Sequence, residues 1–184
     1  MRFRTTTFLD ISLIWLLLAG GDGRAQESQT QPTEYQIKAA FIFNFARFVE
    51  WPPQAFNGSK APFVIGILGE NPFHDDLEQT VRDKTIDDHP MVVKEFRSPT
   101  DATNCHILFI STSEKPRLAQ ILKGLRGASV LTVGEMDRFA ESGGMINFIV
   151  QGTKIRFKIN NEVATSAGLK ISSKLLNLAL RART

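Results

Sequence analysis

Short apolar runs separated by polar turns recur along most of the chain. Runs rich in Val, Ile, Leu and Phe and bounded by turn-forming residues are typical of β-strands, and they occur at residues 63–68, 91–96, 106–110 and 130–133. Between or beside them, apolar residues recur every three or four positions, which predicts helices at 33–49, 73–82, 113–125 and 136–142. Strands and helices therefore alternate over this part of the chain.

The C-terminal part has a different pattern. Residues 145–150 and 155–159 are two predicted strands joined across Gln151-Gly152-Thr153, which is a hairpin signal. In the second strand Lys and Arg alternate with Ile and Phe, so one face is expected to be buried and the other basic. A short helix or turn at 161–167, an extended piece at 168–171 and a last helix at 174–182, capped by Ser172-Ser173, follow.

Alternating strands and helices followed by a hairpin predict an α/β fold. We expect a single three-layer domain with a mixed, mostly parallel sheet of five or six strands. Helices should cover both faces of this sheet, and the C-terminal hairpin should supply its antiparallel part. The chain length suits one such domain with a real core.

The helix that starts at Glu34 and runs to Glu50 carries the strongest pattern. At about 100° per residue its apolar side chains fill an arc of roughly 200°, about twice what an ordinary surface helix needs. Only Glu34 and Lys38 interrupt the arc, which is made of Ile37, Phe48, Phe41, Phe45, Val49, Ile42, Tyr35 and Ala46. The sheet can cover one side, so the rest needs another helix, such as the C-terminal one, or a second chain. This pattern is the basis for expecting a homodimer.

Phe43 falls outside that arc, beside Arg47 and Glu50. An exposed Phe in this place suggests an interface, whereas core packing is the alternative interpretation of the aromatic stripe. The candidate partner-binding residues are Phe43, Asn44, Arg47, Glu50 and Trp51.

The first residues resemble a secretory signal peptide. Arg2 and Arg4 precede an apolar run at 8–20, and Gly23-Arg24-Ala25 places small residues before a cleavage site. The alternatives are a membrane anchor, for which the run is short, and a buried N-terminal helix. We expect a signal peptide at 1–25, a flexible N-terminus at 26–33, a domain at 34–184, and export of the mature protein to the periplasm.

Charge and cysteine content restrict the partners. The formal net charge is +3, and +2 after removal of the predicted signal peptide, with basic and acidic residues interspersed. This is not the footprint of a nucleic-acid-binding protein. Cys105 is the only cysteine, so no intrachain disulfide can form, and it begins an apolar run where a buried thiol is expected.

The sequence contains few signs of a catalytic or cofactor motif. Gly66 and Gly69 follow the first strand, but the third glycine of a dinucleotide fingerprint is missing. The acid and histidine groups at 74–76 and 87–89 match no zinc spacing and lie in polar turns. Residues 111–113 lack the glycines of a nucleophile elbow and are better explained as a helix cap. We therefore expect no enzyme and no cofactor, with a small ligand at the strand ends as an alternative.

Two separated segments carry a family resemblance. The first is Lys38-Ala39-Ala40-Phe41-Ile42-Phe43-Asn44-Phe45-Ala46-Arg47-Phe48-Val49-Glu50-Trp51-Pro52. The second comprises Gly144-Met145-Ile146-Asn147-Phe148, Ile155-Arg156-Phe157-Lys158-Ile159-Asn160 and the stretch from Ala167-Gly168-Leu169 to Leu176-Asn177-Leu178-Ala179. Together they resemble the YfiR family, and the resemblance extends over most of residues 34–180.

The resemblance implies a periplasmic regulatory domain without known catalysis. The protein that names the family represses an inner-membrane diguanylate cyclase through the periplasmic part of that enzyme, and an outer-membrane lipoprotein relieves the repression. The expected output is the level of cyclic-di-GMP and hence biofilm formation. The alternative function is a periplasmic small-molecule-binding module that feeds a sensor or transport system. Family members often carry paired cysteines, but Asn147 and Thr153 near the hairpin are not cysteine, which puts redox control in doubt.

Overall fold

The computed structural model describes residues 31–58 and 60–180. The predicted signal peptide at 1–25, its cleavage site and the predicted flexible segment up to residue 30 lie outside the described residues. The end of the predicted helix at 174–182 does so as well.

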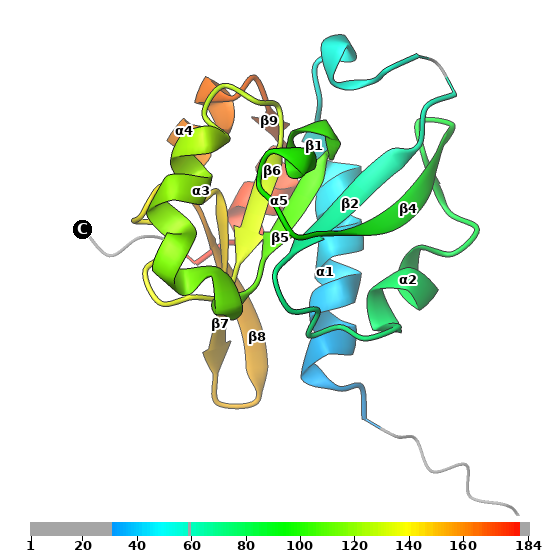
Figure 1. The fold of residues 1–184 in the computed structure, drawn as a ribbon. Coiled ribbons are helices and arrows are strands. Elements are labelled where there is room, and N and C mark those ends of the chain that lie inside the picture. Colours follow the sequence, from blue (N-terminus) through cyan, green and yellow to red (C-terminus); the bar gives the residue numbers. More distant parts are fainter. Residues whose placement is uncertain (1–30, 59, 181–184) are drawn as a thin grey trace, which may run out of the picture. The chain divides into compact units, whose positions relative to one another are not determined.

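A seven-stranded sheet forms the centre of the described part of the chain (Figure 1). β4, β2, β5, β6 and β7 are parallel, and β3 and β8 pair antiparallel at the two edges. In spatial order the strands are β3 (Thr85–Ile86), β4 (His89–Phe96), β2 (Phe63–Leu68), β5 (Ile107–Ile110), β6 (Leu131–Gly134), β7 (Ile146–Gln151) and β8 (Lys154–Ile159). The predicted α/β class and mostly parallel sheet are confirmed, with one more strand than expected, because β3 is only two residues long.

Helices cover both faces of this sheet. α1 (Glu34–Phe48) and α2 (Asp76–Val81) pack on one face, and α3 (Leu118–Gly124) packs on the other. Successive residues of a strand point to opposite faces, so the fully buried β2 contributes Ile65 and Ile67 to the α1 side and Leu68 to the α3 side. The three-layer arrangement is the expected one.

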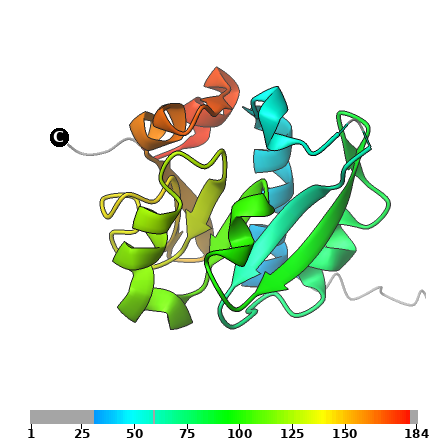
Figure 2. The ribbon, with the colours of Figure 1, turned by 45° about the horizontal axis from the view of Figure 1, so that its top comes forward.

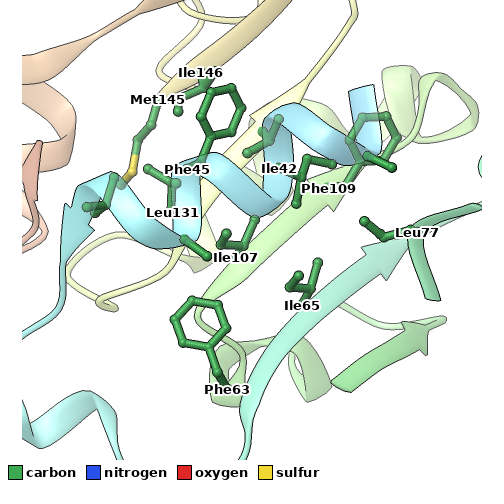
Figure 3. Packing of buried hydrophobic residues seen from close by; sticks show 14 of the residues in the cluster. Ile42, Phe45, Phe63, Ile65, Leu77, Ile107, Phe109, Leu131, Met145 and Ile146 are labelled. Carbon is green, nitrogen blue, oxygen red and sulfur yellow. The ribbon is translucent and has the colours of Figure 1, made fainter. Parts of the chain in front are cut away.

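α1 lies across the sheet with its most apolar face inward. Thr33 caps it through a capping box, because its hydroxyl accepts from the Gln36 N–H while the Gln36 side chain accepts from the Thr33 N–H. Figure 3 shows Ile42 and Phe45 against side chains of the strands beneath, including Ile65 and Ile107. The second apolar flank, formed by Ile37, Phe41 and Phe48, stays half-buried.

The last described segments return to α1, which is one of the two ways of covering the apolar arc that the sequence left open. β1 (Val49–Glu50) pairs antiparallel with β9 (Lys170–Ile171), and α5 (Ser173–Leu178) contacts α1. Figure 2 shows α4 (Asn161–Ser166) and α5, in orange and red, gathered beside the C-terminal end of α1. Ser172 caps α5 by accepting from the Leu175 N–H, as expected. The small β1–β9 sheet was not predicted, because it joins segments far apart in the sequence.

The predicted helix at 136–142 is wrong, since these residues form consecutive turns. Arg138 has φ +57°, which interrupts a right-handed helical path. The buried Asn147 side chain donates to the Met136 carbonyl, so that carbonyl is used outside a helix. Phe139 is fully buried and packs into the core on the α3 side of the sheet, beside Gly134 and Gly144.

The predicted helix at 113–125 begins differently from expectation. A 3₁₀ segment, Thr112–Arg117, contains Pro116 and precedes α3. Ser113 was expected to cap this helix. Its hydroxyl instead accepts from the Glu70 N–H at 3.0 Å, on the loop after β2.

Candidate functional site

The candidate partner-binding residues lie on the C-terminal half of α1 and the two residues that follow it. We call Phe43, Asn44, Arg47, Glu50 and Trp51 the α1 surface. Its backbone is held by the β1–β9 pairing and by the hydrogen bond from the Ser172 N–H to the Phe48 carbonyl. The surface therefore rests on a fixed helix end.

Phe43 and Arg47 are brought together. Phe43 is half-buried at the edge of the main core, and the guanidinium of Arg47 lies 5.9 Å from its ring centroid. Lys84, after α2, places its ammonium 4.2 Å from the same ring. A cation over an aromatic face is favourable, and both Arg47 and Lys84 are exposed, so two positive charges flank the Phe43 ring at the surface. Because Phe43 is half-buried, its side chain is less exposed than the sequence pattern suggested for an interface residue.

Asn44 is directed at its own helix. Its side-chain amide donates to the Ala40 carbonyl at 2.9 Å, which uses one of its two donor hydrogens. Asn44 and Phe43 are both half-buried, but as neighbours on a helix they point in different directions. They therefore do not form one continuous contact surface.

Glu50 and Trp51 differ in exposure although they are neighbours. Glu50 is exposed and stands opposite Lys170 in the β1–β9 register. Trp51 is half-buried, donates its indole N–H to the His106 carbonyl at 3.1 Å, and sets its ring edge against Phe63 at 5.0 Å. Arg47 and Glu50 are thus the freely exposed members of the α1 surface, and Trp51 connects the surface to the core.

His106 sits beneath Trp51 and is the most unusual polar group nearby. It is 4% exposed, and its Nδ1 accepts from the Val64 N–H at 3.0 Å, as expected of a hydrogen-bonded core histidine. Its Nε2 is buried without a hydrogen-bond partner among the described residues. Burial, followed by the nearby His89, lowers the pKa of His106 to about 4. The aromatic residues that surround it come from three segments, so sequence patterns gave no sign of the cluster.

Lys38 is the second group whose role the sequence did not reveal. As a charged residue it interrupts the apolar arc of α1, yet its side chain is 2% exposed and paired with the carboxylates of Glu34 and Glu135. Burial alone would lower its pKa, but the hydrogen bonds to Glu135 and Glu34 prevail and raise it. Glu135 directly follows β6, so the ion pair ties the start of α1 to the carboxyl end of a central strand.

The expected crevice at the strand ends is partly closed. Parallel α/β sheets bind ligands where the strand order reverses, which here lies between β2 and β5. At this point Gly69, at φ +92°, lets the chain pass so closely that a Cβ would overlap the Ser113 hydroxyl. The chain's own Ser113 and Glu114 occupy the space beside this turn.

An open cleft of about 980 Å³ lies farther along the same edge of the sheet. β6 ends at Gly134, which pairs with Asn147, so among the described strands the rest of β7 has only β8 as a neighbour. The cleft borders this free part of β7, the first turns of α1 and the loop after β6, and carries charged side chains of both signs: Glu34, Lys38, Glu135, Asp137, Arg138, Glu141 and Lys158. Val150, on β7, is 53% exposed there. A polar or zwitterionic small molecule is the kind of ligand that such a lining suits.

The remaining candidates are the acid and histidine groups at 74–76 and 87–89 and the thiol of Cys105, and their geometry supports no chemical role. In the groups at 74–76 and 87–89 the side chains are exposed or half-buried, and across residues 31–58 and 60–180 no three His, Cys, Asp or Glu side chains are placed to hold a metal ion. Cys105 is buried, donates to the Ala102 carbonyl, and has its pKa raised to about 12 by burial. It is a core thiol, as expected.

A protein-family model described as YfiR/HmsC-like matches residues 35–180. The chain belongs to the YfiR/HmsC-like family. The match begins in the first turn of α1 and ends just after α5. It includes the whole α1 surface, His106 with the aromatic residues around it, and nearly all of the cleft lining. YfiR/HmsC-like domains are regulatory and periplasmic, and the family is known for control of diguanylate cyclases. In the described part of this YfiR/HmsC-like chain, no helix is both long and apolar enough to span a bilayer.

Proposed function

We propose that this chain is a periplasmic regulator that binds and represses a membrane signalling protein, a diguanylate cyclase that controls cyclic-di-GMP and biofilm formation. The observation that carries the proposal is the YfiR/HmsC-like match over residues 35–180. The predicted signal peptide agrees with it, because an exported chain can reach the periplasmic part of such an enzyme.

The α1 surface is the proposed contact for the periplasmic domain of the cyclase. Arg47 and Glu50 are exposed, and Phe43 offers a half-buried aromatic ring framed by Arg47 and Lys84. Arg beside an aromatic ring is a composition enriched in binding hot spots. An outer-membrane lipoprotein is the proposed second partner, which relieves the repression.

Measurement of cyclic-di-GMP in cells with and without the gene tests the function. Deletion should raise cyclic-di-GMP and biofilm mass, and the wild-type gene should restore both. Unchanged cyclic-di-GMP across envelope stresses would remove the cyclase from the proposal.

A charge reversal tests the surface. Arg47→Glu should weaken binding to the cyclase periplasmic domain by about tenfold or more, as expected for a contact worth at least 1.4 kcal/mol. Arg156→Glu on β8 is the matched control, because Arg156 is equally a surface arginine and lies outside the α1 surface. Equal binding by both variants and the wild type would place the contact elsewhere.

A homodimer is part of the same proposal. Ile37, Phe41 and Phe48 leave a half-buried apolar flank on α1 even though the sheet, α2 and α5 contact this helix. Light scattering at micromolar concentration should give twice the chain mass, whereas a monomer would mean that the chain's own elements suffice to cover α1.

A small-molecule-binding module is the second candidate function, and the cleft of about 980 Å³ favours it. A thermal-shift screen with periplasmic metabolites should then find a ligand whose effect Asp137→Ala reduces. The absence of any shift over a broad panel of metabolites would count against this candidate.

A further inference from the structure

The ring of His106 lies inside a stack of aromatic rings that the segment 51–62, described at residues 51–58 and 60–62, closes from outside. His106 stacks on Phe63 at 4.5 Å with an interplanar angle of 19°, and Phe56 covers its other side at 4.5 Å. His89 stacks on Phe56 in turn, at 4.3 Å. We call His89, Phe56, His106 and Phe63 the His106 column. Its members come from the 51–62 segment, β2, β4 and the residue before β5, so it is a tertiary structure and not a local one.

The hydrogen bond at Nδ1 fixes the protonation state of His106. The Val64 N–H donates to Nδ1, so the single proton of the neutral ring is on Nε2. Nε2 is buried and has no hydrogen-bond partner among residues 31–58 and 60–180. A second proton must therefore be added at Nδ1, where it would face the Val64 N–H donor directly. Protonation and the present packing of the ring are incompatible.

Among residues 31–58 and 60–180, none of the groups that act on the pKa of His106 is a carboxylate that would compensate a charge on it. The titratable group that acts on it is His89 on β4, and its charge opposes a second positive charge. The backbone at Ala55, in the 3₁₀ turn Pro53–Ala55, favours the charged form, but burial outweighs it. The charged residues nearest along the covering segment, Glu50 and Lys60, are exposed.

The His106 column also holds the covering segment to the sheet. Trp51 donates to the His106 carbonyl, Phe56 stacks on the His106 ring, and His89 Nδ1 donates to the Ala61 carbonyl at 2.6 Å. The backbone hydrogen bonds found within residues 51–58 and 60–62 are local, such as Ala55 N–H to the Pro52 carbonyl. Side-chain contacts, and not a backbone ladder, therefore attach this segment.

We propose that His106 is an acid-sensitive latch: a proton from solvent binds Nδ1, breaks the Val64–His106 hydrogen bond, drives the ring out of the column, and releases residues 51–58 and 60–62 from the sheet. Release uncovers Trp51 and the ring of Phe63. The inference concerns a conformational change of this chain and does not depend on which partner the α1 surface binds. A chain exported to the periplasm meets external acidity more directly than a cytoplasmic one.

The direction and size of the effect follow from linkage. His106 has a pKa of about 4 when latched and near 6.5 when free, so a proton binds the released form more tightly and falling pH favours release. The released population should rise roughly 30-fold between pH 7.5 and pH 5.

Hydrogen exchange of the purified chain tests the latch. Exchange rates corrected for the intrinsic effect of pH give the opening equilibrium of each segment. Protection in the 51–62 segment should fall about 30-fold from pH 7.5 to pH 5 while remaining well below that of β5 at each pH. In a chain with Trp15→Phe, Trp51 is the sole tryptophan, and its acrylamide quenching should rise over the same range.

Three variants separate the latch from general acid sensitivity. His106→Asn keeps an acceptor for the Val64 N–H but cannot titrate, and His106→Phe keeps the stacking; in both, the pH dependence of segment 51–62 should disappear. His89→Asn should retain it. The proposal is overturned if the fall in protection persists in the His106 variants, if it vanishes in His89→Asn, if the segment and β5 always show equal protection, or if nothing changes down to pH 5.

Discussion

Replacement of Lys38 by Met tests whether the buried ion pair holds α1 to the carboxyl end of β6. Methionine keeps most of the apolar stem and volume of lysine, so the substitution mainly removes the charge. What remains is Glu135, with its side chain 11% exposed, and Glu34, with its side chain 44% exposed. Glu34 can turn to water, but Glu135 is left with little solvent and without its cation.

Removal of one partner of a fully buried pair costs about 3–5 kcal/mol. Because Glu135 keeps some solvent contact, we expect Lys38→Met to lower the free energy of unfolding by about 2–4 kcal/mol. Lys158→Met is the matched control, since Lys158 and Glu141 form the same kind of pair with side chains 35% and 43% exposed. An exposed pair contributes about 0–1 kcal/mol, so the control should change little.

Urea denaturation at pH 7, followed by circular dichroism, measures both variants against the wild type. The double variant Lys38→Met with Glu135→Gln should be more stable than Lys38→Met alone, because Gln removes the uncompensated charge and still accepts the hydrogen bond from the Tyr35 hydroxyl. The reasoning is refuted if Lys38→Met costs no more than Lys158→Met, or if the double variant shows no recovery.

Three further predictions concern the core. Gly144→Ala should lower the free energy of unfolding in urea by about 1–3 kcal/mol, because a Cβ there would overlap the buried Phe139 ring. Gly124→Ala in α3 is the control, since a Cβ there meets open space and should be neutral or stabilising. Equal effects of the two substitutions would contradict this packing. The folded state lowers the pKa of His106 to about 4 from 6.5, so its contribution to stability is complete above pH 6.5 and is lost as pH falls towards 4, by about 3 kcal/mol in all. Denaturation at several pH values should show this slope in the wild type and a smaller one in His106→Asn. Cys105 is buried, and burial raises its pKa to about 12. Its thiol should therefore react with a disulfide reagent at pH 8 only as fast as the folded chain opens. Rapid labelling of the folded protein would contradict this burial.

Local pattern was sufficient to predict most of the fold. Each of the six apolar runs predicted as strands is a strand of the main sheet, because a run of Val, Ile, Leu and Phe between turn signals has few other ways to bury itself. The arc of α1 also predicted that a second element must pack on it, and α5 does so. Where local pattern failed, at residues 136–142, a tertiary contact prevailed: Phe139 packs against two glycines and Asn147 uses the Met136 carbonyl.

The candidate site was predicted less completely than the fold. Periodicity located the α1 surface but could not show that Asn44 bonds its own helix or that Trp51 anchors to His106. The exposure of a side chain depends on what packs over it, and that is decided by segments distant in the sequence.

The sequence by itself determined the order and type of the main elements, the amphipathic character of α1 and the family resemblance, because these are properties of neighbouring residues. Only the tertiary structure decided that Lys38 pairs with Glu135, that β1 pairs with β9, and that His106 is enclosed between Phe56 and Phe63. Each of these contacts joins side chains or strands from separate segments. Their energies depend on distance and burial, which no local pattern of residue types specifies.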